Sequence, residues 1–300
     1  MTKSSFIPLP NSIDATLQLL REHNYVCDRS LATLTFLSLE LDRPIFLEGE
    51  AGVGKTELAR TLAIALGRDL IRLQCYEGLD ATTAVYEWNF AAQMLAMKQG
   101  EADVDIYDQR FLIKRPLLQA MGQHEYGPPV LLIDEIDRTD APFEAFLLEA
   151  LSDYQVTIPE IGTIKAPAPP IVILTSNRTR EVHDALKRRC LYHWVDYPDF
   201  DRELEIITSR VPKAAASLSR DIVGFVQTLR EENLFKKPGL AETIDWASCL
   251  VALDVIALSP EIISDTIGAV LKYQDDIAKL QGSEVNRILE ASKAKLNVYS

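Results

Sequence analysis

The sequence predicts an α/β fold with a parallel sheet covered by helices on both faces, followed by a small helical domain. Short apolar runs of strand length alternate with segments in which apolar residues recur three and four positions apart. A glycine-rich stretch directly follows one of these runs. After Pro198 the strand signals stop and only helical spacing remains. We therefore expect an α/β domain over residues 1–200 and a helical domain over residues 201–300.

Length and composition agree with a folded, non-membrane protein. The chain has 300 residues, 47% of them apolar and 25% charged, which is typical of soluble globular proteins. The N-terminus shows no basic segment joined to an apolar one, and the apolar runs are too short to cross a bilayer. Four scattered cysteines without a C-x-x-C pair indicate reduced thiols and a cytoplasmic location. The net charge of −13 makes charge-driven binding of nucleic acid unlikely.

The apolar spacing predicts the elements of the α/β domain one by one. Arg43-Pro44 ends a helix because the residue before proline avoids the helical region, and Gly67 is a suitable helix end. The acidic stretch Glu101–Asp108 is expected to be a solvated loop. Two β-prone runs around Pro159–Gly162 predict a hairpin. In order, we expect helices at 13–20 and 31–41, a strand at 45–47, a helix at 57–66, a strand at 70–75, a mixed helical segment at 80–100, a helix at 111–121, a strand at 130–133, a helix at 142–151, hairpin strands at 155–158 and 163–165, and a strand at 171–175.

The helical domain is expected to contain four helices. Apolar residues at helical spacing place them at 201–210, 217–232, 241–258 and 261–280. No internal repeat interrupts this pattern.

A glycine-framed motif follows the strand predicted at 45–47. It satisfies G-x-x-x-x-G-K-[ST], a pattern whose backbone N–H groups surround nucleotide phosphates. The start of the following helix adds its positive end. Lys55 is suited to reach the β and γ phosphates, and the Thr56 hydroxyl to coordinate Mg²⁺. The residues expected to bind the nucleotide are Gly49, Glu50, Ala51, Gly52, Val53, Gly54, Lys55 and Thr56.

An acidic pair ends the strand predicted at 130–133. Parallel strands bring their carboxyl ends to one edge of the sheet, where ligands of such folds bind. Asp134 is therefore assigned to the magnesium shell, and Glu135 to polarising the attacking water. An acidic pair after a strand is also a common turn former, but the upstream phosphate motif favours the functional interpretation.

Two more polar positions suit nucleotide chemistry. Asn177 ends the strand predicted at 171–175, where its amide can sense the γ-phosphate and help to hold the water; opening a turn is the alternative. The basic stretch 186–190 contains Arg188 and Arg189. We expect Arg189, with Arg188 as the second choice, to reach the γ-phosphate of a neighbouring subunit and stabilise transition-state charge. The alternative is a basic helix end favoured by the helix dipole.

Together these segments resemble the AAA+ ATPases, and within them the MoxR family. GEAGVGKTELA (residues 49–59) and LLIDEIDR (131–138) look like the Walker A and Walker B segments of that family. LLEALSDYQVTI (147–158) is similar to its helix that leads into a hairpin before the sensor strand. The sequence at 80–127 is similar to its helix-2 insertion. The resemblance covers residues 25–198 well and the helical domain loosely.

Within that family, two stretches look most like the CoxD-type accessory ATPases linked to carbon monoxide dehydrogenase and related molybdenum hydroxylases. These stretches are KRRCLYHWVDYP (187–198) and KKPGLAETIDWA (236–247). The resemblance implies an AAA+ three-layer parallel sheet with a helix-2 insertion and a pre-sensor hairpin, followed by a helical lid. It also implies ATP and Mg²⁺ as cofactors, with Asn177 as sensor 1 and Arg189 as the ring arginine.

The function implied by the resemblance is that of a MoxR-type chaperone that hydrolyses ATP to remodel or activate a protein client. Its partners would be further copies of the chain in a hexameric ring, a protein with a von Willebrand factor A domain, and a metalloenzyme client, so the activity would serve maturation of a metal-cofactor enzyme. One departure stands out. Many MoxR proteins carry a sensor 2 arginine at the start of a lid helix, and the stretch 236–242 contains none.

Two other features leave alternatives open. Arg138 beside the acidic pair could bridge subunits, but a surface ion pair is the favoured account. Tyr86, Trp88 and Phe90 could grip a client, but packing inside the inserted segment is favoured.

A P-loop small-molecule kinase is the alternative function; it would need arginines closing over its substrates, and the region after residue 236 is arginine-poor. A GTP-driven nucleic-acid motor is disfavoured by the acidic balance and by the lack of an N-K-x-D motif.

Overall fold

The computed structural model describes residues 7–99 and 105–298, and the chain divides into two compact units. The first unit comprises residues 1–23, 28–49 and 55–194, and the second comprises 24–27, 50–54 and 195–300. The predicted domain boundary near residue 200 stays a prediction. Part of the predicted acidic loop, residues 101–104, lies outside the described residues.

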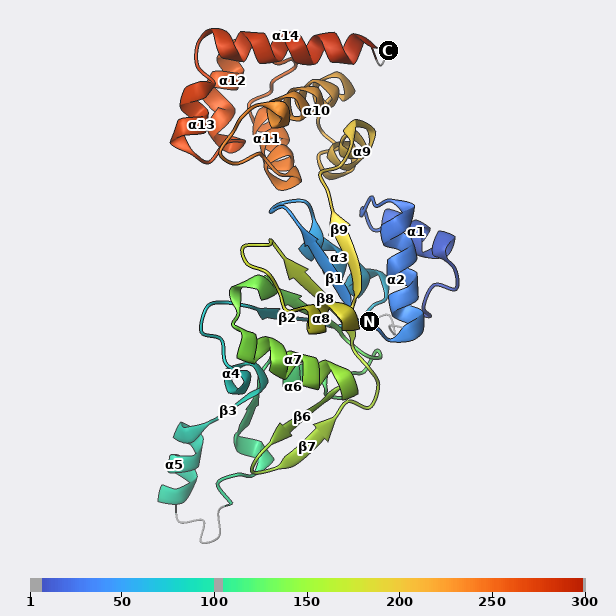
Figure 1. The fold of residues 1–300 in the computed structure, drawn as a ribbon, viewed down its shortest axis with the longest axis vertical. Helices are drawn as coiled ribbons and strands as arrows, with labels where there is room; N and C mark the ends of the chain where they lie inside the picture. Colours follow the sequence, from blue (N-terminus) through green and yellow to red (C-terminus); the bar gives the residue numbers. More distant parts are fainter. Residues whose placement is uncertain (1–6, 100–104, 299–300) are drawn as a thin grey trace. The chain divides into compact units, whose positions relative to one another are not determined.

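The first unit alternates helices and strands along the chain (Figure 1). Its helices are α1 (Ile13–Glu22), α2 (Arg29–Leu41), α3 (Lys55–Ala65), α4 (Ala81–Val85), α5 (Phe90–Lys98), α6 (Pro116–Ala120), α7 (Ala141–Asp153) and α8 (Asp184–Arg189). Its strands are β1 (Ile45–Gly49), β2 (Leu70–Gln74), β3 (Tyr86–Trp88), β4 (Leu112–Lys114), β5 (Val130–Asp134), β6 (Gln155–Ile158), β7 (Gly162–Lys165), β8 (Ile171–Ser176) and β9 (Leu191–Val195).

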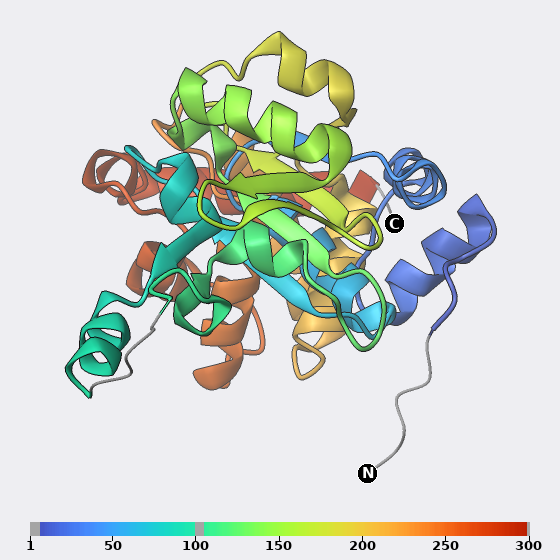
Figure 2. The same cartoon turned by 90° about the horizontal axis from the view of Figure 1, so that it is seen from below.

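Five of these strands form the central sheet, in the order β2-β5-β8-β1-β9. β1 pairs with β8, β8 with β5, and β5 with β2, all in parallel. Every residue of β1 and β5 is buried, because helices cover both faces. Helix α3 contacts β1, β2, β5 and β8, and α7 lies over one face of the sheet in Figure 2. The predicted α/β class with a parallel sheet is confirmed.

Side chains on one face of the sheet share a core with α7. Leu131 and Ile133 of β5 join Phe143 and Leu147 of α7 in one buried cluster. The intervening Leu132 is buried as well and points to the opposite face, since successive strand residues alternate. The apolar run 130–133 is therefore continuous in sequence because both of its faces are covered.

The predicted hairpin is confirmed as β6 and β7, which pair antiparallel. The inserted segment differs from the expectation. The span 80–100 contains β3 between α4 and α5, and the span 111–121 contains β4 before α6, with β3 and β4 paired as a ribbon. Trp88 is 7% exposed, in agreement with the packing interpretation, whereas Phe90 is 66% exposed and does not fit it.

Strand β9 was not expected. Its first four residues alternate between half-buried and exposed along the edge of the sheet, and only Val195 is buried. His193 in the middle interrupts the apolar run, so a search for continuous buried runs misses this strand.

The second unit contains six helices among the described residues. They are α9 (Phe200–Arg210), α10 (Ala216–Glu231), α11 (Leu240–Ala252), α12 (Pro260–Thr266), α13 (Gln274–Lys279) and α14 (Ser283–Val298). The expectation of one helix over 261–280 was wrong, because α12 gives way to a 3-10 turn at Ile267–Ala269 and α13 begins only at Gln274. Gly268 in that turn weakens a continuous helix.

A buried ion pair stabilises the second unit. The Glu203 carboxylate, which is fully buried, accepts hydrogen bonds from both terminal nitrogens of Arg230 at 2.6 and 2.7 Å. It also accepts a hydrogen bond from the Thr243 hydroxyl at 2.9 Å. These contacts join α9, α10 and α11 in one network.

Replacing Glu203 with alanine is expected to reduce the free energy of unfolding by about 3–5 kcal/mol, because the Arg230 guanidinium would remain buried without its carboxylate. Chemical denaturation followed by tryptophan fluorescence measures the loss. Glu290→Ala is a matched control, since Glu290 pairs with Lys293 on the surface and such pairs contribute about 0–1 kcal/mol. Equal stability of Glu203→Ala and the control would contradict the assigned role.

No helix among the described residues is long and apolar enough to cross a bilayer. None of the cysteines forms a disulfide; Cys75 and Cys190 are buried and Cys249 is exposed.

Candidate nucleotide site

The glycine-framed motif forms a loop between β1 and α3. Gly52 and Gly54 have φ angles of +77° and +97°, a left-handed conformation that glycine adopts without strain. Lys55 begins α3, is 5% exposed, and its ammonium group donates to the Gly49 carbonyl at 2.8 Å. The lysine side chain therefore folds back onto the last residue of β1.

Within the second unit, the loop contacts the first turn of α11. The Ala241 amide donates to the Gly52 carbonyl at 3.1 Å. A Cβ atom on Gly239 would lie 2.8 Å from the Ala51 carbonyl oxygen, so only glycine permits this approach.

Asp134, at the end of β5, is held by hydroxyl groups from two elements. It is 3% exposed. One carboxylate oxygen accepts hydrogen bonds from Thr56 Oγ1 at 3.0 Å and from Thr175 Oγ1. The other oxygen is paired with the guanidinium of Arg72, which lies on the neighbouring strand β2. The structure thus brings together Thr56 and Asp134, the two residues predicted to bind the metal.

The donor set around Asp134 fits Mg²⁺. Hydroxyl and carboxylate oxygens are the hard ligands that this ion prefers. No group of three or more His, Cys, Asp or Glu side chains suited to a metal occurs among the described residues. A site with few protein ligands is typical of Mg²⁺ held jointly with substrate phosphates. Bound there through Thr56 and Asp134, the ion would neutralise charge on the phosphates.

Glu135 follows directly and has a left-handed backbone, with φ +59°. Its amide donates to Thr175 Oγ1 at 3.0 Å. Its carboxylate pairs with Arg138 at 2.7 Å and accepts hydrogen bonds from Gln74 Nε2 at 3.2 Å and Asn177 Nδ2 at 3.4 Å. Arg138 therefore forms an ion pair within the chain, and the predicted base and the predicted sensor amide are in direct contact.

Asp137 fixes the segment that carries Asn177. Its buried carboxylate accepts hydrogen bonds from the Asn177 amide at 3.2 Å and from the Thr179 amide at 2.8 Å. Burial and the carboxylates of Asp134, Asp137 and Glu135 raise the pKa of the nearby Cys75 thiol to about 12. Three carboxylates therefore lie near the end of β5, two of them paired with Arg72 and Arg138.

Several contributors to this network were not singled out from the sequence. Asp137 lies inside the acidic motif and could have been noticed there. No sequence pattern pointed to Arg72 and Gln74, because only the parallel pairing of β2 with β5 places them beside the acidic pair. The hydroxyl of Thr175 was hidden within an apolar strand.

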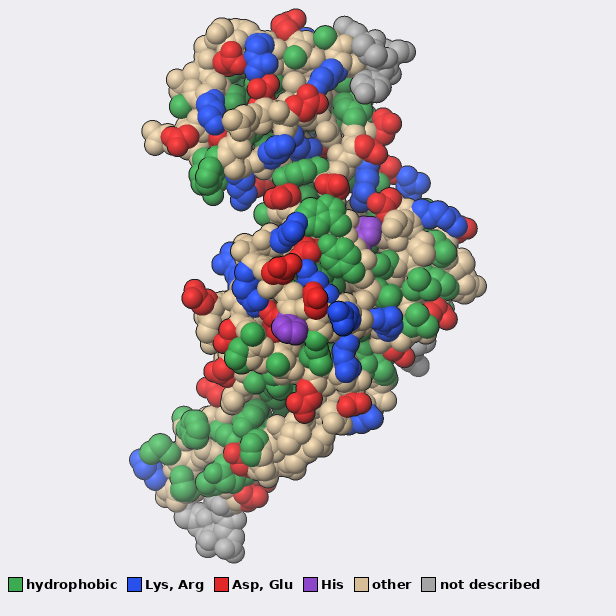
Figure 3. Space-filling model, viewed as in Figure 1, with side chains coloured by type: hydrophobic (Ala, Val, Ile, Leu, Met, Phe, Trp, Pro, Cys, Tyr) green, Lys and Arg blue, Asp and Glu red, His purple; other side chains and the backbone are tan. Residues whose placement is uncertain are grey.

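The basic stretch at α8 divides into two parts. The Lys187 ammonium lies 3.3 Å from the buried carboxylate of Glu48, the residue before the glycine motif. Arg188 and Arg189 are exposed at the end of α8 and do not join the network around Asp134. Lys and Arg side chains gather over the region of α8 in Figure 3. Exposed arginines at this place are available to another molecule.

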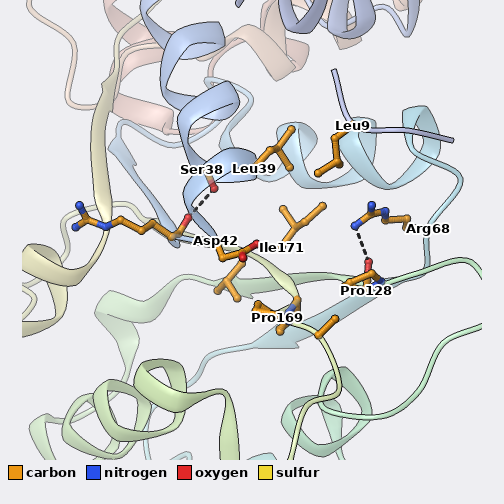
Figure 4. Close-up of a pocket in the computed structure, with 12 residues that line it drawn as sticks. Leu9, Ser38, Leu39, Asp42, Arg68, Pro128, Pro169 and Ile171 are labelled. Carbon is orange, nitrogen blue, oxygen red and sulfur yellow. Dashed lines mark hydrogen bonds between the residues drawn. The ribbon is translucent and has the colours of Figure 1, made fainter. Parts of the chain in front are cut away.

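A separate cavity of about 200 Å³ lies at the opposite, amino edge of the sheet (Figure 4). Its lining includes Pro128 and Ile171 at the starts of β5 and β8, together with Leu39 of α2 and Arg68. The Arg68 guanidinium donates to the Pro128 carbonyl at 3.2 Å. Because it lies away from the glycine motif, this cavity is not the nucleotide site.

The sheet carries a glycine-framed loop after β1, an acidic pair after β5 and Asn177 after β8. This is the arrangement of the AAA+ P-loop fold. Residues 44–190, which carry all of these features, match the AAA domain of the dynein-related subfamily.

Three individual proteins similar to this chain share less than 30% of its residues. An uncharacterised protein of Staphylococcus saprophyticus is 29% identical over 192 residues, which cover 62% of this chain and 65% of that protein. The gas vesicle ATPase GvpN1 of Halobacterium salinarum is 25% identical over 258 residues, 81% of this chain and 73% of its own. A mutant of RuvB from Thermotoga maritima is 17% identical with a TM-score of 0.49, over 89% of this chain and 72% of that one.

Proposed function

We propose that this protein hydrolyses ATP with Mg²⁺ and uses the energy to change the conformation of a protein client. The observation that carries the proposal is the connected network in which Thr56 meets Asp134 and Glu135 meets Asn177. In it, Lys55 and the loop amides bind the phosphates, and Asp134 with Thr56 holds the metal. Glu135 accepts the proton of the attacking water, which Asn177 helps to orient.

We further propose that the active form is a homo-oligomeric ring, hexameric by resemblance to the MoxR family. The exposed position of Arg188 and Arg189 supports this. An arginine that stabilises the transition state must approach the γ-phosphate, and these side chains take no part in the network of their own subunit. In the ring they reach the nucleotide of the neighbour.

Replacing Arg189 with alanine is expected to lower kcat by about 100-fold or more, because an arginine supplied in trans contributes about 10³–10⁵. Binding of ATP by the isolated subunit should remain. ATPase assays over a range of protein concentrations provide the measurement. The parent should gain activity per subunit as it assembles, whereas activity independent of concentration in an assembling sample would count against the ring.

The client is proposed from the resemblance to CoxD-type ATPases. It is a metalloenzyme, of the molybdenum hydroxylase class, that needs remodelling for its cofactor to be inserted, and a von Willebrand factor A protein would deliver it in the cytoplasm. Producing such an enzyme with the parent protein, or with the Glu135→Gln variant, tests the idea through the cofactor content of the purified client. Phosphorylation of a small metabolite by the purified protein would support a kinase instead.

A further inference from the structure

The arginine-bearing end of α8 is built in an unusual way. This helix has only six residues, and its last two are Arg188 and Arg189. Both side chains are long and exposed, so their reach is defined only if the backbone beneath them is fixed. An isolated helix of this length is not stable in water, because nucleation costs more than so few hydrogen bonds return. Other groups must therefore hold it.

The last four carbonyl groups of a helix have no partner within it, and in α8 each has another donor. The Leu186 carbonyl accepts from the Cys190 thiol at 3.2 Å, and the Lys187 carbonyl from the Cys190 amide at 3.1 Å. The carbonyl groups of Arg188 and Arg189 both accept hydrogen bonds from one side chain, that of Arg43. Arg43 donates from Nη2 to the Arg188 carbonyl at 3.2 Å, and from Nη2 and Nε to the Arg189 carbonyl at 3.2 and 3.4 Å.

Arg43 is itself anchored in the short connection between α2 and β1. Its amide donates to the Ser38 carbonyl at 3.2 Å, and its carbonyl accepts from the Ser38 hydroxyl at 2.6 Å, a bond drawn in Figure 4. The following Pro44 is buried, and its carbonyl accepts from the Leu191 amide at 2.8 Å. The guanidinium therefore extends from a fixed point at the start of the strand that leads into the phosphate loop.

The same connection also touches the hairpin. The Tyr154 hydroxyl donates to the Asp42 carbonyl at 2.7 Å. Tyr154 caps the end of α7 and directly precedes β6. Three elements thus converge on residues 42–44: the strand before the phosphate loop, the end of α8 and the base of the hairpin.

We propose that Arg43 is a positioning residue that holds the end of α8 so that Arg188 and Arg189 reach the nucleotide of the neighbouring subunit. The inference rests on the proposed function, since it assigns a task to the arginines in trans. Through Arg43, the strand that enters a subunit's own phosphate loop is joined to the arginines it offers to its neighbour. Arg43 contacts no nucleotide in this scheme.

The first test compares ATP hydrolysis by assembled Arg43→Ala, Arg43→Lys and Arg189→Ala variants. Arg29→Ala is the control, because Arg29 forms only an exposed ion pair with Asp14. A misplacement of about 1 Å can cost about 100-fold in rate. We expect Arg43→Ala to lose at least about tenfold in kcat while its KM for ATP stays within about threefold, because its own phosphate loop is intact. Lysine, which cannot donate from two nitrogens, should recover part of the rate.

A second measurement separates positioning from direct contact. Hydrogen exchange at the Cys190 and Leu191 amides should become faster in Arg43→Ala, since the helix end loses its cap. The same amides should exchange at the parent's rate in Arg189→Ala, which changes only an exposed side chain.

The third experiment measures ATP hydrolysis by assemblies that contain subunits of two different variants. Arg43→Ala supplies an intact active site, and Glu135→Gln supplies an intact α8, so a mixed assembly should regain activity that neither variant has alone. Mixing Arg189→Ala with Glu135→Gln should do the same.

Three results would each overturn the assignment of Arg43. The first is Arg43→Ala activity within about twofold of the parent, and the second is unchanged hydrogen exchange at the end of α8. The third is a mixture of Arg43→Ala with Glu135→Gln that stays inactive while the Arg189→Ala mixture recovers. Full activity of Arg189→Ala would instead remove the proposed trans arginine itself, and the inference with it.

Discussion

The Glu135→Gln variant is expected to lose more than about 100-fold of the ATP hydrolysis rate while it still binds ATP. A positioned general base contributes about 10²–10⁴ to a rate, and glutamine preserves the shape of the side chain but cannot take a proton. Its amide can still contact Asn177, so the fold of the site should persist. Steady-state hydrolysis and equilibrium binding of a fluorescent ATP analogue measure the two effects separately.

Glu149→Gln is the matched control for this variant. Glu149 lies on α7, is exposed and takes no part in the network around Asp134. It should hydrolyse ATP as the parent does. Parent-like turnover by Glu135→Gln would show that another group activates the water.

Replacing Lys55 with alanine is expected to impair binding and hydrolysis together. The ammonium group now donates to the Gly49 carbonyl, and in the complex it would exchange this partner for phosphate oxygens. A hydrogen bond to a charged group contributes about 1.5–3 kcal/mol, which corresponds to roughly 10- to 100-fold in affinity. Titration calorimetry with MgATP gives the dissociation constant directly.

Lys165→Ala provides the comparison for Lys55→Ala, because Lys165 is exposed on β7. It removes the same charge from the protein as a whole. If both variants bind MgATP as tightly as the parent, the phosphate loop does not hold the nucleotide and the proposed function fails.

Much of the sheet could be predicted because its strands are buried on both faces. The runs 45–47 and 130–133 are continuous and apolar, and an acidic residue ends each of them abruptly. The same sequence signals singled out the glycine motif, Asp134, Glu135 and Asn177, and the structure places Thr56 against Asp134 and Asn177 against Glu135. Three consecutive parallel strands bring such residues to one edge, so their proximity followed from the fold class.

Residues whose role depends on strand order could not be predicted. Arg72 and Gln74 are ordinary polar residues on an edge strand, and only pairing with β5 places them beside Asp134. Arg43 looked like a helix end before proline, yet it contacts residues 145 and 146 positions away. Contacts over such separations leave no local pattern of spacing. The edge strand β9 was missed for a different reason, since only one of its residues is fully buried.

The carboxylate of Glu135 has three hydrogen-bonding partners in this structure. Gln74, Arg138 and Asn177 each occupy part of it, and they come from three different segments of the chain. An ionised carboxylate has about four acceptor positions, so these three partners leave room for one more donor, such as a water molecule. Because the partners come from β2, the turn after β5 and the end of β8, a shift of any of these elements would change the orientation of the carboxylate.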